Sequence, residues 1–387
     1  MAYGRSGRLV KTTLGFLVYG EQGTRKSSFC LEALKLKNDN GKPCRVLYID
    51  GEQGSIDAYL DDYEDEGIDL QNLYILYTQS LSEVEQYIKR AKNNKNFYYF
   101  DEDTGEETEE VYLDADGNPF RPDMIVVDGV SLLYVSKQQS IVEFSKKRAT
   151  VRANKKEAKG WEKEVAIEGA GLEMKDYNTL KFEGQNLVLN LLGCGKHFAL
   201  TMREEDEKIQ VKDPDTKEYK TVPSGRKRPQ GFKDVVYNVK TVIRLFEDTD
   251  GLFKGIIEKK DRTKVFKQGE VIVEPSILAW QSVIDKNKDR KASVLGEDLK
   301  DSVKKEVETI EKENGKINDD YKEAQRVKRK LETVEEYQLE IKETLSKLSQ
   351  VEKGKKQAEL EENGLPKNYG TLKDLETLEK YLSIISN

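Results

Sequence analysis

The stretch Gly20-Glu21-Gln22-Gly23-Thr24-Arg25-Lys26-Ser27-Ser28 follows directly on the apolar run Leu14-Gly15-Phe16-Leu17-Val18-Tyr19. A bound phosphate needs unobstructed backbone N–H groups, a lysine that reaches it and, where Mg²⁺ accompanies it, a hydroxyl. The stretch supplies these groups at the spacing of the pattern G-x-x-x-x-G-K-[ST], through Gly20, Gly23, Lys26 and Ser27. It predicts a phosphate-binding loop that joins a buried strand to a helix.

One residue of this loop departs from the pattern. Arg25 stands where a glycine usually lets the chain pass close to the phosphate. A glycine-rich turn with a surface lysine is the alternative interpretation, because short motifs also occur by chance. If the loop binds ATP, the residues around its phosphates are Gly20, Gln22, Gly23, Thr24, Arg25, Lys26, Ser27 and Ser28.

Length and composition narrow the class of protein. A chain of 387 residues predicts more than one folded unit. A net charge of −7 excludes a globally basic coat, so that any polynucleotide site must be local. Three cysteines and one histidine lack the spacing of a zinc site. With no signal-like start and no long apolar run, we expect a cytoplasmic protein without a membrane segment.

Short apolar runs alternate with helical patterns in the first part of the chain, as in residues 27–37 and 82–92. Such alternation predicts βαβ units with a mostly parallel sheet, covered by helices on both faces. Three later runs, at 239–246, 252–258 and 270–273, predict an antiparallel extension of that sheet. The runs of the parallel part are 14–19, 45–50, 73–77, 124–128 and 197–201.

Two insertions, at about 97–120 and 137–180, interrupt this α/β core of residues 1–285. Residues 101–116 carry nine acidic side chains and no basic one, which predicts a solvated hairpin or loop. Residues 146–163 carry eight basic side chains against two acidic ones. This stretch is a candidate polynucleotide contact, with a solvated helix as the alternative, and its candidate cations are Lys146, Lys147, Arg148 and Arg152.

Residues 286–387 form a different region, rich in lysine and glutamate. Apolar residues recur there at spacings of three and four between 327 and 351, which indicates a helix that pairs with another helix, as in a coiled coil. We interpret this region as a helical module that contacts a protein partner.

An acid at the end of a buried strand can hold Mg²⁺ together with the loop hydroxyl. Asp128 ends the run Met124-Ile125-Val126-Val127-Asp128, so that Asp128 and Ser27 are the predicted metal ligands. Hydrolysis also needs a group that activates water. The run 46–50 ends in Asp50-Gly51-Glu52, and this strand closing on Asp-x-Glu, with a helix and a second strand after it, resembles the RecA-type recombinase ATPases.

The resemblance covers about residues 10–285 and is closest to phage-encoded RecA-like ATPases that assist single-strand annealing and recombination. It implies a RecA-like P-loop NTPase fold, with Lys26 on the phosphates and Glu52 activating water; a surface acid is the alternative for Glu52. Thr201 and Arg203 stand where the family has a polar sensor after a strand. Lys260 and Arg262 resemble the family's pair that reaches a neighbouring subunit's nucleotide, with a solvated basic turn as the alternative.

The resemblance also implies partners. In this family the segment that corresponds to 203–238 is a mobile loop that contacts DNA, and here it carries a basic, Gly/Pro-rich stretch with one aromatic residue. Cations would contact phosphates and the aromatic ring would stack on a base, as suits single-stranded DNA. The candidates are Arg226, Lys227, Arg228 and Phe232.

We therefore expect a homo-oligomeric ATPase that acts with Mg²⁺ on single-stranded DNA in phage recombination or replication. A motor or helicase loader activated by a protein partner is one alternative. A nucleotide-gated binding module with little turnover is another.

Overall fold

The computed structural model describes residues 6–156, 158–212, 217–259, 261–313, 334–339, 341–342, 344–346 and 348–386. The chain divides into two compact units, residues 1–301 and 302–387. Each unit is described by itself.

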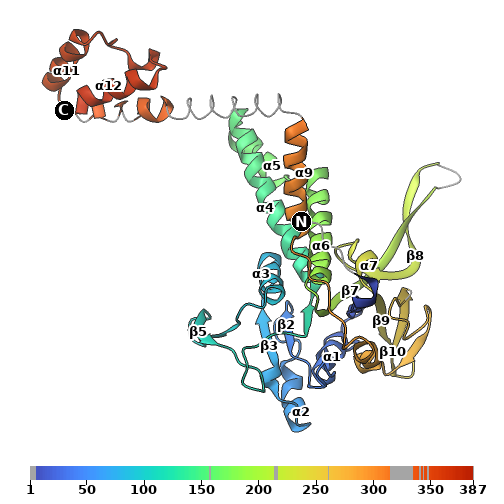
Figure 1. Cartoon of the computed structure of the whole chain (residues 1–387). Helices are drawn as coiled ribbons and strands as arrows, with labels where there is room; N and C mark the ends of the chain where they lie inside the picture. The colour runs from blue at the N-terminus through green and yellow to red at the C-terminus, as the bar shows by residue number, and fades with distance from the viewer. Residues whose placement is uncertain are drawn as a thin grey trace. The chain divides into compact units, whose positions relative to one another are not determined.

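The first unit is built on a mostly parallel sheet (Figure 1). Its strands lie in the order β11-β10-β9-β1-β7-β6-β2-β3. β1 pairs in parallel with β7 and β9, β6 pairs in parallel with β7 and β2, and β2 with β3. The α/β prediction is confirmed. The bounds are β1 (Gly15–Gly20), β2 (Val46–Asp50), β3 (Leu73–Tyr77), β6 (Met124–Asp128), β7 (His197–Lys212), β9 (Thr241–Glu247), β10 (Phe253–Lys259) and β11 (Val271–Val273).

The antiparallel extension is smaller than the sequence predicts. β9 joins the parallel part beside β1, so that of the three predicted strands β10 and β11 form the antiparallel extension. Because β10 runs against β9, it starts at the edge where the parallel strands end and finishes at the edge where they begin. These two edges are called the carboxyl edge and the amino edge below.

Apolar side chains cover both faces of the sheet, as the continuous apolar runs predict. One cluster packs β-strand side chains against α3 (Leu81–Lys92) and α6 (Met174–Gly193). The other packs the opposite face against α1 (Lys26–Leu31) and the buried Trp280, which precedes α8 (Gln281–Asp285). Shorter helices complete this unit, namely η1 (Gly7–Leu9), η2 (Glu32–Lys35), η3 (Asp57–Tyr59), α2 (Leu60–Asp65), η4 (Leu70–Asn72), α7 (Val235–Asn238) and η5 (Ile277–Trp280).

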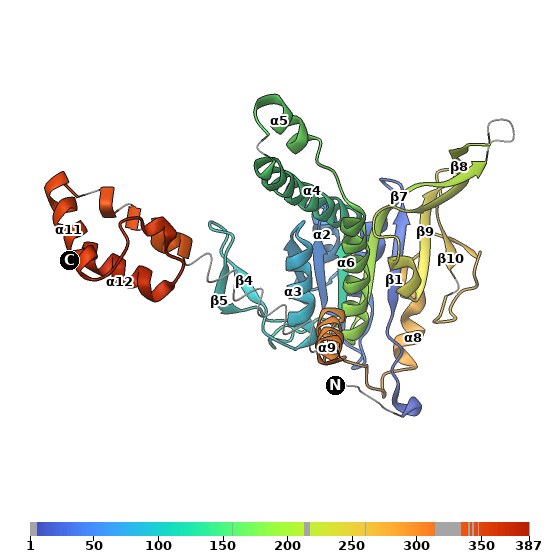
Figure 2. The same cartoon turned by 90° about the horizontal axis from the view of Figure 1, so that it is seen from above.

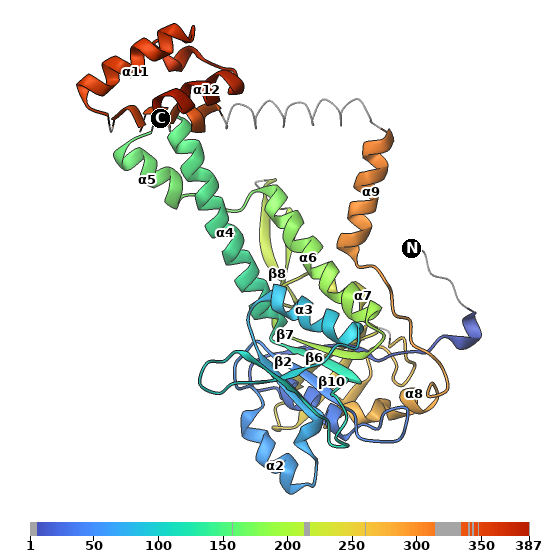
Figure 3. The ribbon, with the colours of Figure 1, turned by 60° about the vertical axis from the view of Figure 1, so that its left-hand side comes forward.

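The two insertions have regular structure. The acidic one forms the hairpin of β4 (Tyr98–Phe100) and β5 (Glu107–Val111). The second forms α4 (Val130–Lys155), which extends away from the sheet, and α5 (Gly160–Glu168), which packs on α4 (Figure 3). The predicted DNA-contacting loop is instead a β-hairpin in the residues that the structure describes. β7 continues as far as Lys212 and pairs antiparallel with β8 (Tyr219–Pro229), and the hairpin projects from the carboxyl edge (Figure 2).

The second unit has an apolar cluster of its own, which includes the buried residues Ile341, Leu360 and Leu378. The described part of the predicted apolar stripe contributes to it, and residues 327–333, 340, 343 and 347 of that stripe lie outside the described residues. Its helices are α11 (Gln350–Glu362), η6 (Tyr369–Thr371) and α12 (Leu375–Ser386), while α9 (Leu299–Glu313) spans the boundary of the two units. Among the described residues, no helix has the length and apolar character that crossing a membrane requires.

Candidate nucleotide site

The predicted phosphate loop connects β1 to α1 at the carboxyl edge. Gly20 has no room for a side chain, because an added Cβ would lie 2.2 Å from the carbonyl oxygen of Leu245. The loop closes on the carbonyl oxygen of Glu21, which accepts hydrogen bonds from Thr24 Oγ1 at 2.9 Å and from Lys26 Nζ at 2.6 Å. The ammonium of Lys26 is thus held at the mouth of the loop by a neutral acceptor that a phosphate oxygen can replace.

Arg25 takes the backbone conformation of the glycine that it replaces. Its φ is 60°, in the left-handed region. Its side chain leaves the loop toward the neighbouring strands, where the guanidinium lies 3.6 Å from the centre of the Phe253 ring and pairs with Glu274 at 3.1 Å. The Arg25 side chain therefore lies outside the loop, and the inner surface of the loop is left to backbone groups.

Asp128, the predicted metal ligand, is buried at the end of β6 with three hydroxyl donors around it. Tyr48 and Ser55 each donate to Oδ2 at 2.7 Å, and Thr201 donates to Oδ1. Burial first, and then the Asp128 charge, raise the pKa of Tyr48 well above its ordinary value, so that its hydroxyl remains a donor. The carboxylate is thus oriented by hydrogen bonds without a cation touching it.

Sequence analysis missed Tyr48 and Ser55. The available signal was a tyrosine inside an otherwise aliphatic strand. Tyr48 stands beside Val126 in the β2–β6 register, and Val126 lies two residues before Asp128 on the same face of the sheet. Polar side chains in diagonal positions on paired strands are close enough to bond.

The loop that carries Glu52 is fixed by Asp50. The buried Asp50 carboxylate accepts four backbone N–H bonds, at 2.8 to 3.0 Å, from residues 52 to 55. Asp50 is therefore a structural acid that holds the turn after β2. Glu52 is the acid of this turn that faces the site.

Glu52 meets Arg203, which comes from β7. Glu52 Oε1 accepts from Arg203 Nε at 3.2 Å and from Arg203 Nη2 at 3.1 Å. Burial lowers the pKa of Lys26, while the charges of Glu52 and Asp128 raise it, so that both acids act on the same ammonium. Predicted residues from four separate segments, namely Lys26, Glu52, Asp128, Thr201 and Arg203, thus gather at the carboxyl edge.

The site can accept Mg²⁺ only with help from a ligand. Among the described residues there is no group of three or more acidic, histidine or cysteine side chains that could hold a metal. Ser27 and Asp128 offer a hydroxyl and a carboxylate oxygen. Mg²⁺ in nucleotide sites is held by few protein oxygens, with phosphate oxygens and water completing the shell, so that this sparse set fits the ion.

Of the two residues predicted to act on a neighbouring subunit, Arg262 is described by the structure and is not part of this cluster. Lys260 lies outside the described residues. Arg262 follows β10 at the amino edge, where its backbone N–H donates to Lys240 O at 3.1 Å and its guanidinium to Tyr237 O at 3.4 Å. It lies at the opposite end of the strands from Lys26 of its own chain.

Most cations proposed to contact DNA have carboxylate partners within the chain. In the helical insertion Lys146 pairs with Glu168 at 3.2 Å, Arg148 with Asp176 at 2.7 Å and Arg152 with Glu173 at 2.9 Å. Arg228 and Lys227 of β8 pair with acids of β7. In the part of the chain that the structure describes, Lys147 and Arg226 have no carboxylate partner.

One of these predictions is corrected by the structure. Phe232 is 3% exposed, and its ring meets Tyr134 edge to face at 5.1 Å. Gly184 of α6 is glycine because a Cβ there would lie 2.6 Å from Phe232. Phe232 is a core residue and has no face on which a base could stack.

Comparisons with known proteins give little. No family model matches the chain, and no curated protein matches it. Among solved structures it is similar to a KaiC-like protein from the archaeon Pyrococcus horikoshii OT3, with 13% sequence identity, 68% of this chain and 89% of that chain covered, and a TM-score of 0.33. A similarity this weak identifies no function.

Proposed function

We propose that the chain is a RecA-like ATPase that binds ATP and Mg²⁺ in the loop of residues 20–28. The observation that supports this proposal is the gathering of Lys26, Glu52, Asp128 and Arg203 beside that loop. One cation, one metal-binding acid and one acid in reach of an attacking water are the groups that phosphoryl transfer to water requires.

Each residue then has a distinct role. Lys26 exchanges the Glu21 carbonyl for phosphate oxygens, and backbone N–H groups of the loop bind the others. Ser27 and Asp128 would hold Mg²⁺, which when bound neutralises phosphate charge. Glu52 accepts the proton of the attacking water. Arg203 holds the Glu52 carboxylate in place, and Thr201 orients Asp128.

We further propose single-stranded DNA as the activator, on the β7–β8 hairpin. The hairpin continues directly from Arg203 and presents the exposed Arg226. Its Lys227 lies 3.7 Å from Glu21 of the phosphate loop, which joins the hairpin to the nucleotide site. In a homo-oligomer Arg262, at the amino edge, is available only to a neighbour's nucleotide. A role in phage recombination follows from the sequence resemblance alone.

The second candidate is an ATPase activated by a protein partner. The observation that favours it is the pairing of most of the predicted DNA-contacting cations with carboxylates of the same chain. A cation that already pairs with a carboxylate neutralises a DNA phosphate less completely. It therefore releases fewer of the counterions condensed on the DNA and contributes less to binding.

The test is ATP hydrolysis by the wild type, Lys26→Ala and the control Lys95→Ala, each with and without single-stranded DNA, at low salt and at ~0.2 M salt. Lys95 is an exposed lysine far along the chain from the loop. Hydrolysis that Lys26→Ala abolishes and that DNA stimulates at low salt supports the first candidate. Hydrolysis indifferent to DNA supports the second, and hydrolysis unaffected by Lys26→Ala contradicts both.

A further inference from the structure

A cavity lies at the amino edge, at the opposite end of the parallel strands from the phosphate loop. It has a volume of about 340 Å³ and opens beside His197, the first residue of β7, and Asp123, which precedes β6. Besides Asp123 and Lys11, four segments line it, and they contribute residues 38–39, Lys92 and Asn94, residues 194–197, and residues 290–292 with Val294. No residue of the candidate nucleotide site lines it.

Positive charge dominates this cavity. Five cationic side chains and two carboxylates line it, and the cations are Lys11, Lys92, Lys196, Arg290 and Lys291.

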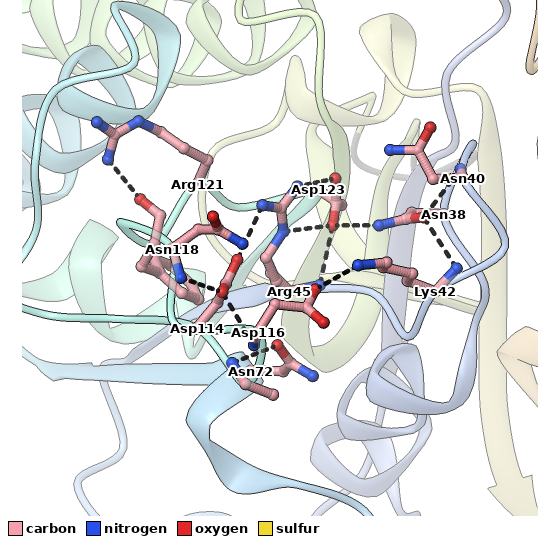
Figure 4. Close-up of polar contacts among 12 residues, drawn as sticks. Asn38, Asn40, Lys42, Arg45, Asn72, Asp114, Asp116, Asn118, Arg121 and Asp123 are labelled. Carbon is pink, nitrogen blue, oxygen red and sulfur yellow. Dashed lines mark hydrogen bonds and ion pairs between the residues drawn. The ribbon is translucent and has the colours of Figure 1, made fainter.

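Both carboxylates are already engaged. Asp123 accepts from Arg45 Nε and Nη2, each at 3.0 Å, and from Asn38 Nδ2 at 3.2 Å, as Figure 4 shows. Asp39 pairs with Lys11. Each acid is therefore paired with a cation other than Lys92, Lys196 or Arg290.

Lys11 is paired and Lys291 has an interaction of its own, which leaves three cations of the five. Within the described ranges, Lys92, Lys196 and Arg290 have no carboxylate partner, and Lys92 and Lys196 are partly buried. Burial, together with the positive charges of Arg45 and Lys11, lowers the pKa of Lys196 against the opposing effect of Asp123. A partly buried cation beside other cations is held at a cost that an anion in the cavity would remove.

His197 adds a neutral donor. It is 5% exposed, and its Nδ1 accepts the backbone N–H of Leu14 at 2.8 Å. Burial, reinforced by the charge of Lys11, lowers its pKa to about 3, so that the ring is neutral. With Nδ1 as acceptor, the ring hydrogen is on Nε2. The lining of the cavity thus combines ammonium and guanidinium groups with an uncharged imidazole ring.

From this excess of donors we propose that the amino-edge cavity binds a small phosphomonoester, such as a sugar phosphate. A phosphate dianion accepts several charge-assisted hydrogen bonds at once, which suits a cavity in which the donors outnumber the available acceptors. The volume is at the lower end of the range for small-molecule pockets and has space for an organic group besides the phosphate. The proposal does not depend on the chain being an ATPase.

The experiment is isothermal titration calorimetry on the full chain carrying Lys26→Ala, which removes the loop lysine from competition. Ribose 5-phosphate and inorganic phosphate are titrated separately. Lys196→Met and Lys92→Met are then added singly, with Lys89→Met as the control, because Lys89 is an exposed lysine of the same helix as Lys92. Far-UV circular dichroism checks that every variant is folded.

We expect ribose 5-phosphate to bind the Lys26→Ala protein more tightly than inorganic phosphate does. Lys196→Met should weaken that binding at least about tenfold, the effect of losing one hydrogen bond to a charged group, and Lys89→Met should leave it unchanged. The proposal is overturned if the Lys26→Ala protein binds neither compound. It is also overturned if folded Lys196→Met and Lys92→Met proteins both bind as tightly as their parent.

Discussion

The two edges of the same sheet differ in whether their charged side chains have partners. At the carboxyl edge Glu52 pairs with Arg203 and the Asp128 carboxylate is surrounded by hydroxyl groups. At the amino edge Lys92, Lys196 and Arg290 have no carboxylate among the described residues. The first arrangement is balanced and suits a ligand that brings its own cation, as ATP brings Mg²⁺. The second carries surplus positive charge and suits an anion alone.

The largest effect should come from Glu52→Gln. If Glu52 accepts the proton of the attacking water, the amide lowers kcat for ATP hydrolysis by about 10² to 10⁴ and leaves ATP binding intact. The matched control is Glu64→Gln, an exposed acid of α2 outside the nucleotide site, which should change kcat less than about twofold. Equal losses in both variants would remove Glu52 from its proposed role.

His197, at the amino edge, should make the free energy of unfolding depend on pH. The folded pKa of His197, about 3, lies below its ordinary value of 6.5. In that window the unfolded chain binds a proton that the folded chain refuses, so the free energy of unfolding falls as the pH drops from 6.5 toward 3. The expected slope is about 1.4 kcal/mol for each pH unit. Urea titrations of wild type and His197→Asn should differ in slope by this amount, and identical slopes would contradict the burial of His197.

Tyr48→Phe tests the hydroxyl groups around Asp128. Losing one hydrogen bond to a buried carboxylate should lower the free energy of unfolding by about 2 kcal/mol. Tyr63→Phe is the control, because Tyr63 is also buried and its hydroxyl makes no hydrogen bond to a described residue. Chemical denaturation of both variants measures the difference. A Tyr48→Phe protein as stable as the control would mean that Asp128 does not depend on this donor.

The smallest effect should come from Arg25. Arg25→Gly relieves a left-handed backbone conformation that costs about 1 kcal/mol and loses a ring contact and an exposed ion pair of similar total size. We expect a stability change below about 1 kcal/mol. Arg25→Ala keeps the unfavourable φ and loses the contacts, so it should be less stable than Arg25→Gly in thermal unfolding. The reverse order would show that the left-handed backbone conformation of residue 25 has no measurable cost.

The sequence predicts the sheet and most of the residues of the carboxyl edge because both depend on local patterns. Residues at or just after the end of a parallel strand lie at the carboxyl edge of the sheet. Lys26, Glu52 and Asp128 could therefore be assigned to one edge from their distance in sequence to a predicted strand end. Tyr48 and Ser55 could not be assigned, because the contact of Tyr48 with Asp128 depends on the register between β2 and β6 and that of Ser55 depends on the turn after β2.

Predictions about surfaces succeeded less well, for a physical reason. The eight basic side chains of residues 146–163 are close in sequence. The acids that neutralise several of them come from later segments, namely Glu168 of α5, Glu173 just before α6 and Asp176 in the first turn of α6. Phe232 lies in a polar stretch and is nevertheless covered by α6 and Tyr134. Composition gives the charge of a segment, whereas its partners depend on the tertiary fold.

β7 has a mechanical consequence. It is one unbroken strand of 16 residues, from His197 at the amino edge through Thr201 and Arg203 to Lys212 in the hairpin. At about 3.3 Å for each residue, it spans about 50 Å. β1 and β6 pair with its first part on either side, while among the described strands β8 alone pairs with its hairpin end. A force on the hairpin is therefore transmitted along β7 to Arg203, the residue at which the pairing of β7 with β1 ends.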